Sequence, residues 1–202
     1  AMSDDCGATG SATVTFSATD ACGNATSTTA TFTIEDTTAP AVMDAMDATV
    51  ECDGAGNAAD LNEWLAANGG ASATDACSGV TWSNDFSGLA AACGPTGSAL
   101  VTFSATDACG NATSTIATFT IEDTTAPAVM DAMNSTVECD GAGNAADLDG
   151  WLASNGGASA TDACSGVTWS NDFDAMSDDC GATGSATVTF SATDACGNAT
   201  ST

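Results

Sequence analysis

The sequence repeats itself, and this repeat limits the possible folds more than any other feature. The string Asp-Thr-Thr-Ala-Pro-Ala-Val begins at Asp36 and again at Asp123, which gives a period of 87 residues. Such self-similarity is the signature of a repeat architecture. We therefore expect three parts: residues 1–35, the C-terminal part of a repeat; residues 36–122, a complete repeat; and residues 123–202, a repeat without its last strand.

A longer period lies behind the first. Residues 1–28 recur unchanged as residues 175–202, an offset of 174 positions or two repeats. Neighbouring repeats therefore differ, whereas alternate repeats match. The differences between neighbours gather at residues 87–92 and 174–179, which we interpret as an exposed loop because loops tolerate change best.

Alternation of apolar and polar residues predicts strands at 98–106 and 116–122. Shorter strands are expected at 48–52 and 80–86. The side chains predicted to face inward on the two long strands are Ala99, Val101, Phe103, Ala105, Ala117, Phe119 and Ile121. Short strands of this kind are most economically packed as an antiparallel sandwich.

One short helix is expected in each repeat, because Leu61, Trp64 and Leu65 follow helical spacing. Asn57 is expected to cap its start, and Asn-Gly-Gly at 68–70 to end it in a left-handed conformation. We interpret Trp64 as a core residue, as we do Trp82, although a platform for stacking sugars is the alternative.

Proline separates the repeats. Asp-Thr-Thr-Ala-Pro at 36–40 and again at 123–127 reads as an extended linker, because proline restricts its own backbone and that of the residue before it. The expected architecture is a linear string of β-sandwiches, each with its own small core.

Several motifs together resemble the HYR-like immunoglobulin-fold repeats. They are Thr-Val-Glu-Cys-Asp from Thr49, Ala-Thr-Asp-Ala-Cys from Ala73 and from Ala105, Cys-Gly-Asn from Cys109, and Asp-Thr-Thr-Ala-Pro from Asp123. Repeats of that family form long arrays in secreted and surface proteins, including those of Bacteroidota. The resemblance implies tandem immunoglobulin-like sandwiches with an adhesive or structural role, and it names no ligand or catalytic residue.

The charge excludes several functions. The chain has no Lys, Arg or His and 27 acidic residues, a formal charge of −27. A Ser or Cys nucleophile would lack its base, and phosphoryl transfer would lack a cation, so we expect no enzyme. Glycosidase chemistry would need two carboxylates facing each other across a cleft, which small sandwiches rarely offer. Nucleic acid and anionic membranes would be repelled.

Ten cysteines in so polar a chain predict disulfides formed in an oxidising compartment, and hence a secreted or cell-surface protein. A zinc site is disfavoured, because the sequence has neither Cys-x-x-Cys nor His. No apolar run approaches the roughly 18 residues of a membrane-spanning helix. We expect any export signal to lie outside these residues.

Each repeat carries four cysteines, and strand length limits their pairing. Cys93 and Cys109 flank a nine-residue strand of about 30 Å, whereas bridged Cα atoms lie within about 7 Å, so these two cannot pair. Cys93 then bonds Cys77 or Cys52. We favour Cys77 with Cys93 and Cys52 with Cys109, the latter resembling the inter-sheet bridge of immunoglobulin domains. The equivalent cysteines of the next repeat are Cys164, Cys180, Cys139 and Cys196.

Acidic residues gather at the repeat junctions and at the end of the long strand. They suggest calcium that stiffens each junction, since no protein cation is present to balance the acids. The alternative is a solvated acidic surface, because no loop of the EF-hand type is present. The candidate ligands are Glu35, Asp36, Asp107, Glu122, Asp123 and Asp194.

The hydroxyl-rich strands suit either simple β-propensity or a surface that carries glycans. Thr37 and Thr124 lie in Asp-Thr-Thr strings that resemble an O-glycosylation signal. Four asparagines begin Asn-x-Ser/Thr sequons, namely Asn24, Asn111, Asn134 and Asn198.

We therefore expect a structural repeat of an extracellular fibre, stalk or adhesin, with a carbohydrate-binding module as the alternative. Its partners would be copies of itself. Either residues 29–35 of one chain complete the sandwich 123–202 of another, or the repeats continue as one longer array. The array is favoured, because a donated strand would bring 11–19 with it, and that strand would have no partner.

Overall fold

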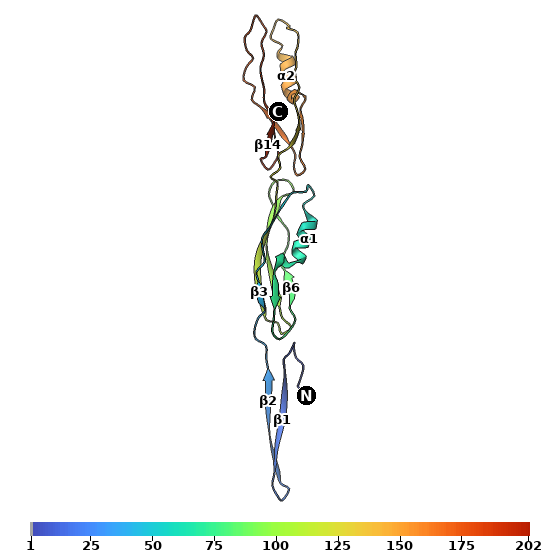
Figure 1. Cartoon of the computed structure of the whole chain (residues 1–202), viewed down its shortest axis with the longest axis vertical. Helices are drawn as coiled ribbons and strands as arrows, with labels where there is room; N and C mark the ends of the chain where they lie inside the picture. The colour runs from blue at the N-terminus through green and yellow to red at the C-terminus, as the bar shows by residue number, and fades with distance from the viewer. Residues whose placement is uncertain (1) are drawn as a thin grey trace. The chain divides into compact units, whose positions relative to one another are not determined.

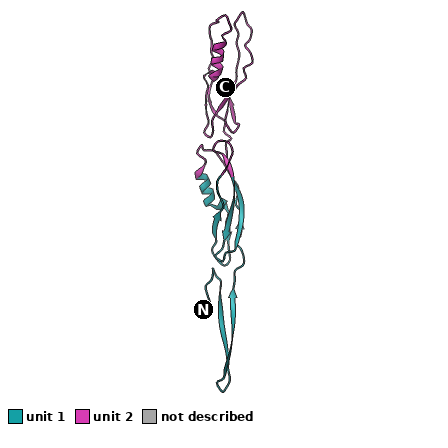
Figure 2. Ribbon diagram, turned by 180° about the vertical axis from the view of Figure 1, so that it is seen from behind, with its two compact units in different colours: residues 1–48, 59–88, 99–119 teal, residues 49–58, 89–98, 120–202 magenta. Residues whose placement is uncertain are grey.

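The structure is a computed structural model that describes residues 2–202. It consists mainly of strands in small antiparallel sheets, with two short α-helices (Figure 1), so the expected all-β class is confirmed. The chain forms two compact units, drawn in two colours in Figure 2. One comprises residues 1–48, 59–88 and 99–119, and the other residues 49–58, 89–98 and 120–202.

The first two strands form a hairpin. β1 (Gly10–Thr19) pairs antiparallel with β2 (Ala25–Ile34), from Gly10 opposite Ile34 to Thr19 opposite Ala25. The turn between them is closed by Asp20, whose backbone N–H donates to the Asn24 carbonyl at 2.9 Å. Asp-Ala-Cys-Gly-Asn therefore acts as the hairpin turn, with Gly23 at a φ of 90°.

The complete repeat contains two sheets. β3 (Ala41–Met43) pairs with β5 (Ser72–Thr74). The larger sheet has the order β4-β9-β8-β6, with β7 also paired to β8. Its strands are β4 (Ala48–Glu51), β9 (Ala112–Glu122), β8 (Gly97–Thr106), β6 (Thr81–Asn84) and β7 (Ala90–Ala91).

The inward face of β8 and β9 is the one that alternation predicted. All seven residues expected to point inward are buried, and Val101 and Phe103 are 0 % exposed. Helix α1 (Ala58–Ala66) covers this face through Trp64, whose ring lies 5.2 Å from that of Phe103 and 5.4 Å from that of Phe119. The indole N–H donates to the Met46 carbonyl at 3.1 Å. Trp64 therefore covers one face of the core.

The end of the helix is as expected. Asn68 and Gly69 have φ angles of 55° and 65°, in the short 3-10 helix Asn68–Gly70. Asn57 is also left-handed, and its side-chain amide binds the Asp53 N–H and the Glu51 carbonyl. Its equivalent Asn144 makes no side-chain capping bond. These asparagines thus order the loop before the helix.

The described part of the third repeat has the same order without counterparts of β4 and β7, and only its last two strands are shorter. Trp151 again packs on Phe190, with ring centroids 5.2 Å apart. The elements are β10 (Ala128–Met130), α2 (Ala145–Ala153), the 3-10 helix Asn155–Gly157, β11 (Ser159–Thr161), β12 (Thr168–Asn171), β13 (Phe190–Thr193) and β14 (Ala199–Ser201). No helix among residues 2–202 is long and apolar enough to span a membrane.

Identical sequences differ in structure where their neighbours differ. β1 has ten residues, whereas the same sequence in the third repeat gives the four residues of β13. The first half of β1 pairs with residues 29–34, and residues 184–189 lack such a partner within the described chain. The hairpin also leaves Phe16 58 % exposed, although its equivalent Phe103 is fully buried.

Three disulfides join cysteines of successive repeats, and each lies within one compact unit. They are Cys6–Cys109, Cys52–Cys164 and Cys93–Cys196. The favoured pairing of Cys77 with Cys93 and of Cys52 with Cys109 is therefore wrong, as is its copy in the next repeat. Within the described residues Cys22, Cys77, Cys139 and Cys180 are free.

Strand length explains the error. Cys109 lies just before β9, whereas the Cys52 N–H donates to the carbonyl of Glu122, the last residue of β9, at 2.7 Å. Eleven extended residues separate these two points, roughly 35 Å. The reasoning that excluded Cys93 with Cys109 also excludes Cys52 with Cys109. Cys52 is instead bonded to Cys164 of the following repeat.

Candidate metal centre

The candidate centre includes the aspartate that follows the first strand of the hairpin in each repeat. Asp107 follows β8, and one carboxylate oxygen accepts the backbone N–H groups of Cys109 and Asn111 at 2.8 and 2.9 Å. Its other oxygen accepts the Asn111 side-chain amide at 2.8 Å. The turn therefore fixes the carboxylate in one orientation.

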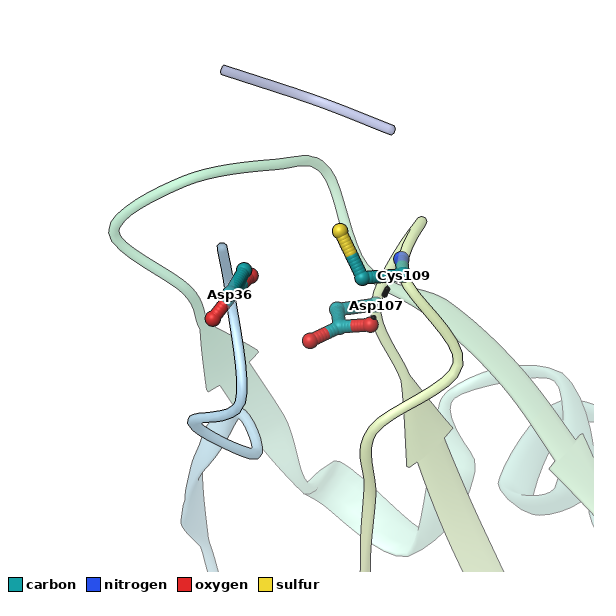
Figure 3. A group of neighbouring side chains, drawn as sticks. All are labelled: Asp36, Asp107 and Cys109. Carbon is teal, nitrogen blue, oxygen red and sulfur yellow. Dashed lines mark hydrogen bonds between the residues drawn. The ribbon is translucent and has the colours of Figure 1, made fainter. Parts of the chain in front are cut away.

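Asp36 approaches Asp107 from the linker before β3 (Figure 3). The same Asn111 amide donates to the Asp36 carbonyl at 3.1 Å, which ties the linker to the turn. One Asp36 carboxylate oxygen accepts the Thr38 N–H at 3.1 Å. The other oxygen, Oδ2, is buried and has no hydrogen-bond partner. A buried carboxylate oxygen without a partner is costly, and a bound cation would satisfy it.

A third aspartate completes the group. Asp75 follows β5, and its carboxylate accepts the N–H groups of Cys77 and Ser78 at 2.8 and 2.9 Å. A ligand atom of Asp36 lies within 4.8 Å of one on Asp107 and, in a second group, of one on Asp75. We call Asp36, Asp75 and Asp107 the first acid cluster.

The next repeat contains an equivalent set, which we call the second acid cluster: Asp123, Asp162 and Asp194. Asp123 and Asp194 lie within 4.8 Å of each other through their ligand atoms and are 8 % and 5 % exposed. Asn198 donates to the Asp194 carboxylate and to the Asp123 carbonyl at 2.8 and 2.9 Å. Asp123 Oδ2 is again buried without a partner. The pairing of the linker aspartate with the aspartate of the hairpin turn thus recurs in both repeats.

The electrostatics of the second acid cluster favour a cation. Burial raises the pKa of Asp123, and the neighbouring carboxylates of Asp162, Asp194 and Glu51 raise it further. Burial also opposes ionisation of Asp194, but the hydrogen bonds from Asn198 outweigh it and lower the pKa of that carboxyl. One carboxylate is thus held ionised beside another whose ionisation is penalised. A divalent cation would remove that penalty.

The donor atoms suit calcium better than zinc. Cys109 and Cys196 lie near the carboxylates, but their sulfur atoms are in disulfides and are no thiolate ligands. Burial raises the pKa of the free Cys77 thiol, and the carboxylates of Asp36, Asp75 and Asp107 raise it further, which opposes a thiolate. Only oxygen ligands remain, as hard cations prefer. Since calcium takes six to eight oxygens, water would supply the remainder.

The structure brings together four of the six sequence-predicted ligands, namely Asp36 with Asp107 and Asp123 with Asp194. Glu35 and Glu122 are exposed and lie outside these groups of described residues. Sequence reasoning missed Asp75 and its equivalent. The signal was present, because Asp75 and Asp107 occupy the same position in the pentapeptide Ala-Thr-Asp-Ala-Cys.

The asparagines of three sequons belong to these turns. The side-chain nitrogens of Asn24, Asn111 and Asn198 donate to the carboxylates of Asp20, Asp107 and Asp194, each at 2.8 Å. A glycan would replace one of the two amide hydrogens, so Asn111 and Asn198, which donate both, would each lose a bond. Asn134, Thr37 and Thr124 are exposed, and Thr124 donates through its hydroxyl to Glu51 at 2.9 Å.

The sequence matches no protein-family model and no curated protein.

Proposed function

We propose that this chain is a structural segment of an extracellular fibre, stalk or adhesin, built from tandem immunoglobulin-like sandwiches of the HYR-like kind. In this proposal the repeats are joined by cystines and stiffened by calcium at the acid clusters. Secretion is favoured because the three disulfides indicate an oxidising environment.

The observation that carries this proposal is the direction of the disulfides. Cys52 and Cys93 belong to one repeat, and both are bonded to cysteines of the following repeat. A small independent domain gains most from bonds within itself, because these limit its own unfolded chain. Bonds from repeat to repeat instead join the repeats covalently in series, as a fibre requires.

Hydrogen bonds support the same junction. The Glu51 carboxylate accepts the Thr124 N–H at 2.9 Å and the hydroxyl groups of Thr124 and Thr125 at 2.9 and 2.8 Å. These contacts attach the linker of one repeat to the last residue of β4 in the repeat before it. The junction is therefore more ordered than a flexible linker would be.

Calcium would act at the same places. Both acid clusters include the aspartate that opens the linker, Asp36 or Asp123. In the first acid cluster the other carboxylates come from the turn after β8 and from the residue after β5. A cation bound by all three would fix the linker to the body of its repeat and neutralise part of the charge of −27.

The alternative of a carbohydrate-binding module finds no platform at Trp64, because its ring faces Phe103 and Phe119 and its N–H is bonded to Met46. A sugar would need the free face of an aromatic ring.

Electron microscopy of the native secreted material tests the proposal. We expect fibres in calcium, and fibres of shorter persistence length after chelation, since chelation frees the linkers while the cystines remain. Dispersed particles with no fibres in calcium would contradict the structural role. Binding on a glycan array that is lost in Trp82→Ala would favour the module instead.

A further inference from the structure

The disulfides follow a rule that is fixed by the period of the sequence. Cys6–Cys109 and Cys93–Cys196 both span 103 residues, and each residue of the second bond lies 87 positions after its counterpart in the first. Cys52–Cys164 spans 112 residues. In every case the Cys52 or Cys93 position of one repeat bonds the Cys77 or Cys109 position of the next.

The four free cysteines occupy positions that are bonded elsewhere in the chain. Cys139 is the Cys52 position of the third repeat, and Cys180 is its Cys93 position. Cys77 is the position that Cys164 occupies one repeat later, and Cys22 is the Cys109 position. Each is therefore one half of a bond whose other half, by the rule, belongs to an adjoining repeat.

The glycines beside Cys139 and Cys180 have the same backbone φ angles as their equivalents beside bonded cysteines. Gly54 and Gly94, each near a bonded cysteine, are packed so closely that an added Cβ would overlap the carbonyl oxygens of Ala163 and Cys164. Their equivalents Gly141 and Gly181 have open space around them. The φ angles nevertheless agree, 78° at both Gly54 and Gly141, and 57° and 60° at Gly94 and Gly181. These glycines therefore keep the same φ whether or not another repeat packs against them.

The burial of the cysteines also differs between the second and the third repeat. Cys52 is 7 % exposed, whereas the equivalent Cys139 is exposed. Glu51 holds Thr124 and Thr125, and within the described chain its equivalent Glu138 is exposed and makes no such contact. A surface of matched cysteine, glycine and glutamate positions, filled in one repeat and open in the next, fits one kind of partner: another copy of the repeat.

Cys77, which by the rule receives its bond from the preceding repeat, has only part of the surroundings of its bonded equivalent. Cys77 lies against the loop of Cys6, since the Ala8 N–H donates to the Cys77 carbonyl at 2.9 Å. Its equivalent Cys164 has both neighbours, with Gly94 against its carbonyl and Cys52 bonded to its sulfur. Cys77 therefore lacks only the loop that corresponds to Cys52.

We propose that Cys139 and Cys180 form disulfides with the Cys77 and Cys109 positions of a further copy of the repeat, and that Cys77 and Cys22 each receive the corresponding bond from the repeat before their own. Each bond forms when two thiols lose two protons and two electrons to a disulfide oxidant, which is reduced to two thiols. The inference rests on the proposed fibre and names its covalent contact.

Peptide mapping of native fibres tests it. The fibres are unfolded in denaturant with iodoacetamide, which alkylates free thiols, and are not reduced. They are then digested with a protease that cleaves on the N-terminal side of aspartate, since the chain has no site for trypsin. Cleavage releases Cys139 in peptide 131–139 and Cys52 in peptide 47–52. We expect both to be cross-linked to a peptide with the sequence of 75–84, which is identical to 162–171, and neither to be alkylated. The Cys52 peptide is the internal control, because its bond is already formed.

Peptide 131–139 that is alkylated while peptide 47–52 is cross-linked would overturn the inference and leave the fibre intact. Absence of fibres would instead remove the proposed function. Electrophoresis after reduction identifies where the partner copy lies. A band near 20 kDa would place it in a separate chain, and a much larger band would place it in the same polypeptide.

Discussion

Cys52 and Cys164 are bonded although 112 residues separate them, and their Cα atoms lie 6.0 Å apart. Both are 7 % exposed, so the bond is inside the junction. Cys52 follows the last residue of β4, and Cys164 follows Asp162 of the second acid cluster. The covalent link and the candidate metal centre are thus adjacent, since the Cys164 N–H donates to the Asp162 carboxylate at 2.9 Å.

Removing this bond should destabilise the junction. We expect the double change Cys52→Ser and Cys164→Ser to lower the free energy of unfolding by about 2 to 4 kcal/mol, since long closed loops gain most from a cross-link. In the isolated chain the matched control is Cys139→Ser, which changes the same position one repeat later, where the thiol is free. Urea unfolding measures both. Equal losses would show that the bond contributes nothing.

The cores of the repeats should respond unequally to the same substitution. Phe103 is 0 % exposed and Phe16, its equivalent, is 58 % exposed. We expect Phe103→Ala to cost about 3 to 5 kcal/mol and Phe16→Ala less than about 1 kcal/mol. Thermal or urea unfolding checks the difference. A large loss for Phe16→Ala would mean that the hairpin face is covered in solution.

Calcium should reverse the effect of the Asp123→Asn substitution on the stability of the chain. Because the pKa of Asp123 is raised in the folded chain, its ionisation lowers stability as pH rises above the ordinary carboxyl pKa. At pH 7 in chelator, Asp123→Asn should therefore stabilise the chain, whereas in calcium it should remove the stabilisation that calcium gives. Glu122→Gln, an exposed neighbour outside the cluster, is the control. An unchanged response to calcium in Asp123→Asn would exclude this residue as a ligand.

Acid should destabilise the chain by protonating the aspartates of the hairpin turns, Asp107 and Asp194. Burial opposes ionisation of Asp107, but hydrogen bonds from Asn111 and Cys109 lower its pKa overall, and those at Asp194 do the same. Their contribution to stability is full above the unfolded carboxyl pKa of about 3.9 and is lost as pH falls through the folded values. In chelator, Asn111→Ala should weaken the chain more at pH 6 than at pH 2, where only its bond to the Asp36 carbonyl remains to be lost. A loss that is independent of pH would contradict this.

The strands could be predicted because alternation is local. Val101 and Phe119 are buried because every second residue of a paired strand faces the core. The length of a strand was less predictable. Residues 184–189 repeat the sequence of 10–15, yet only the earlier copy is a strand, because only it has residues 29–34 beside it.

The site was predictable in part for the same reason. Asp36 was found because it lies at a repeat junction, and Asp107 because it ends a predicted strand. Asp75 was missed although it ends a strand with the same motif, since the three-residue strand β5 is too short for alternation to predict. The pairing of Cys52 could not be deduced without knowing that the end of one repeat meets the beginning of the next.

The cystines also give the backbone a parallel covalent route. Residues 123–127 connect two repeats through peptide bonds, while Cys52–Cys164 and Cys93–Cys196 connect the same repeats through sulfur. A protease that cuts this proline-containing segment would leave both fragments attached until a reductant is added. Tension applied along the chain would likewise divide among three covalent routes, so the linker need not resist it alone.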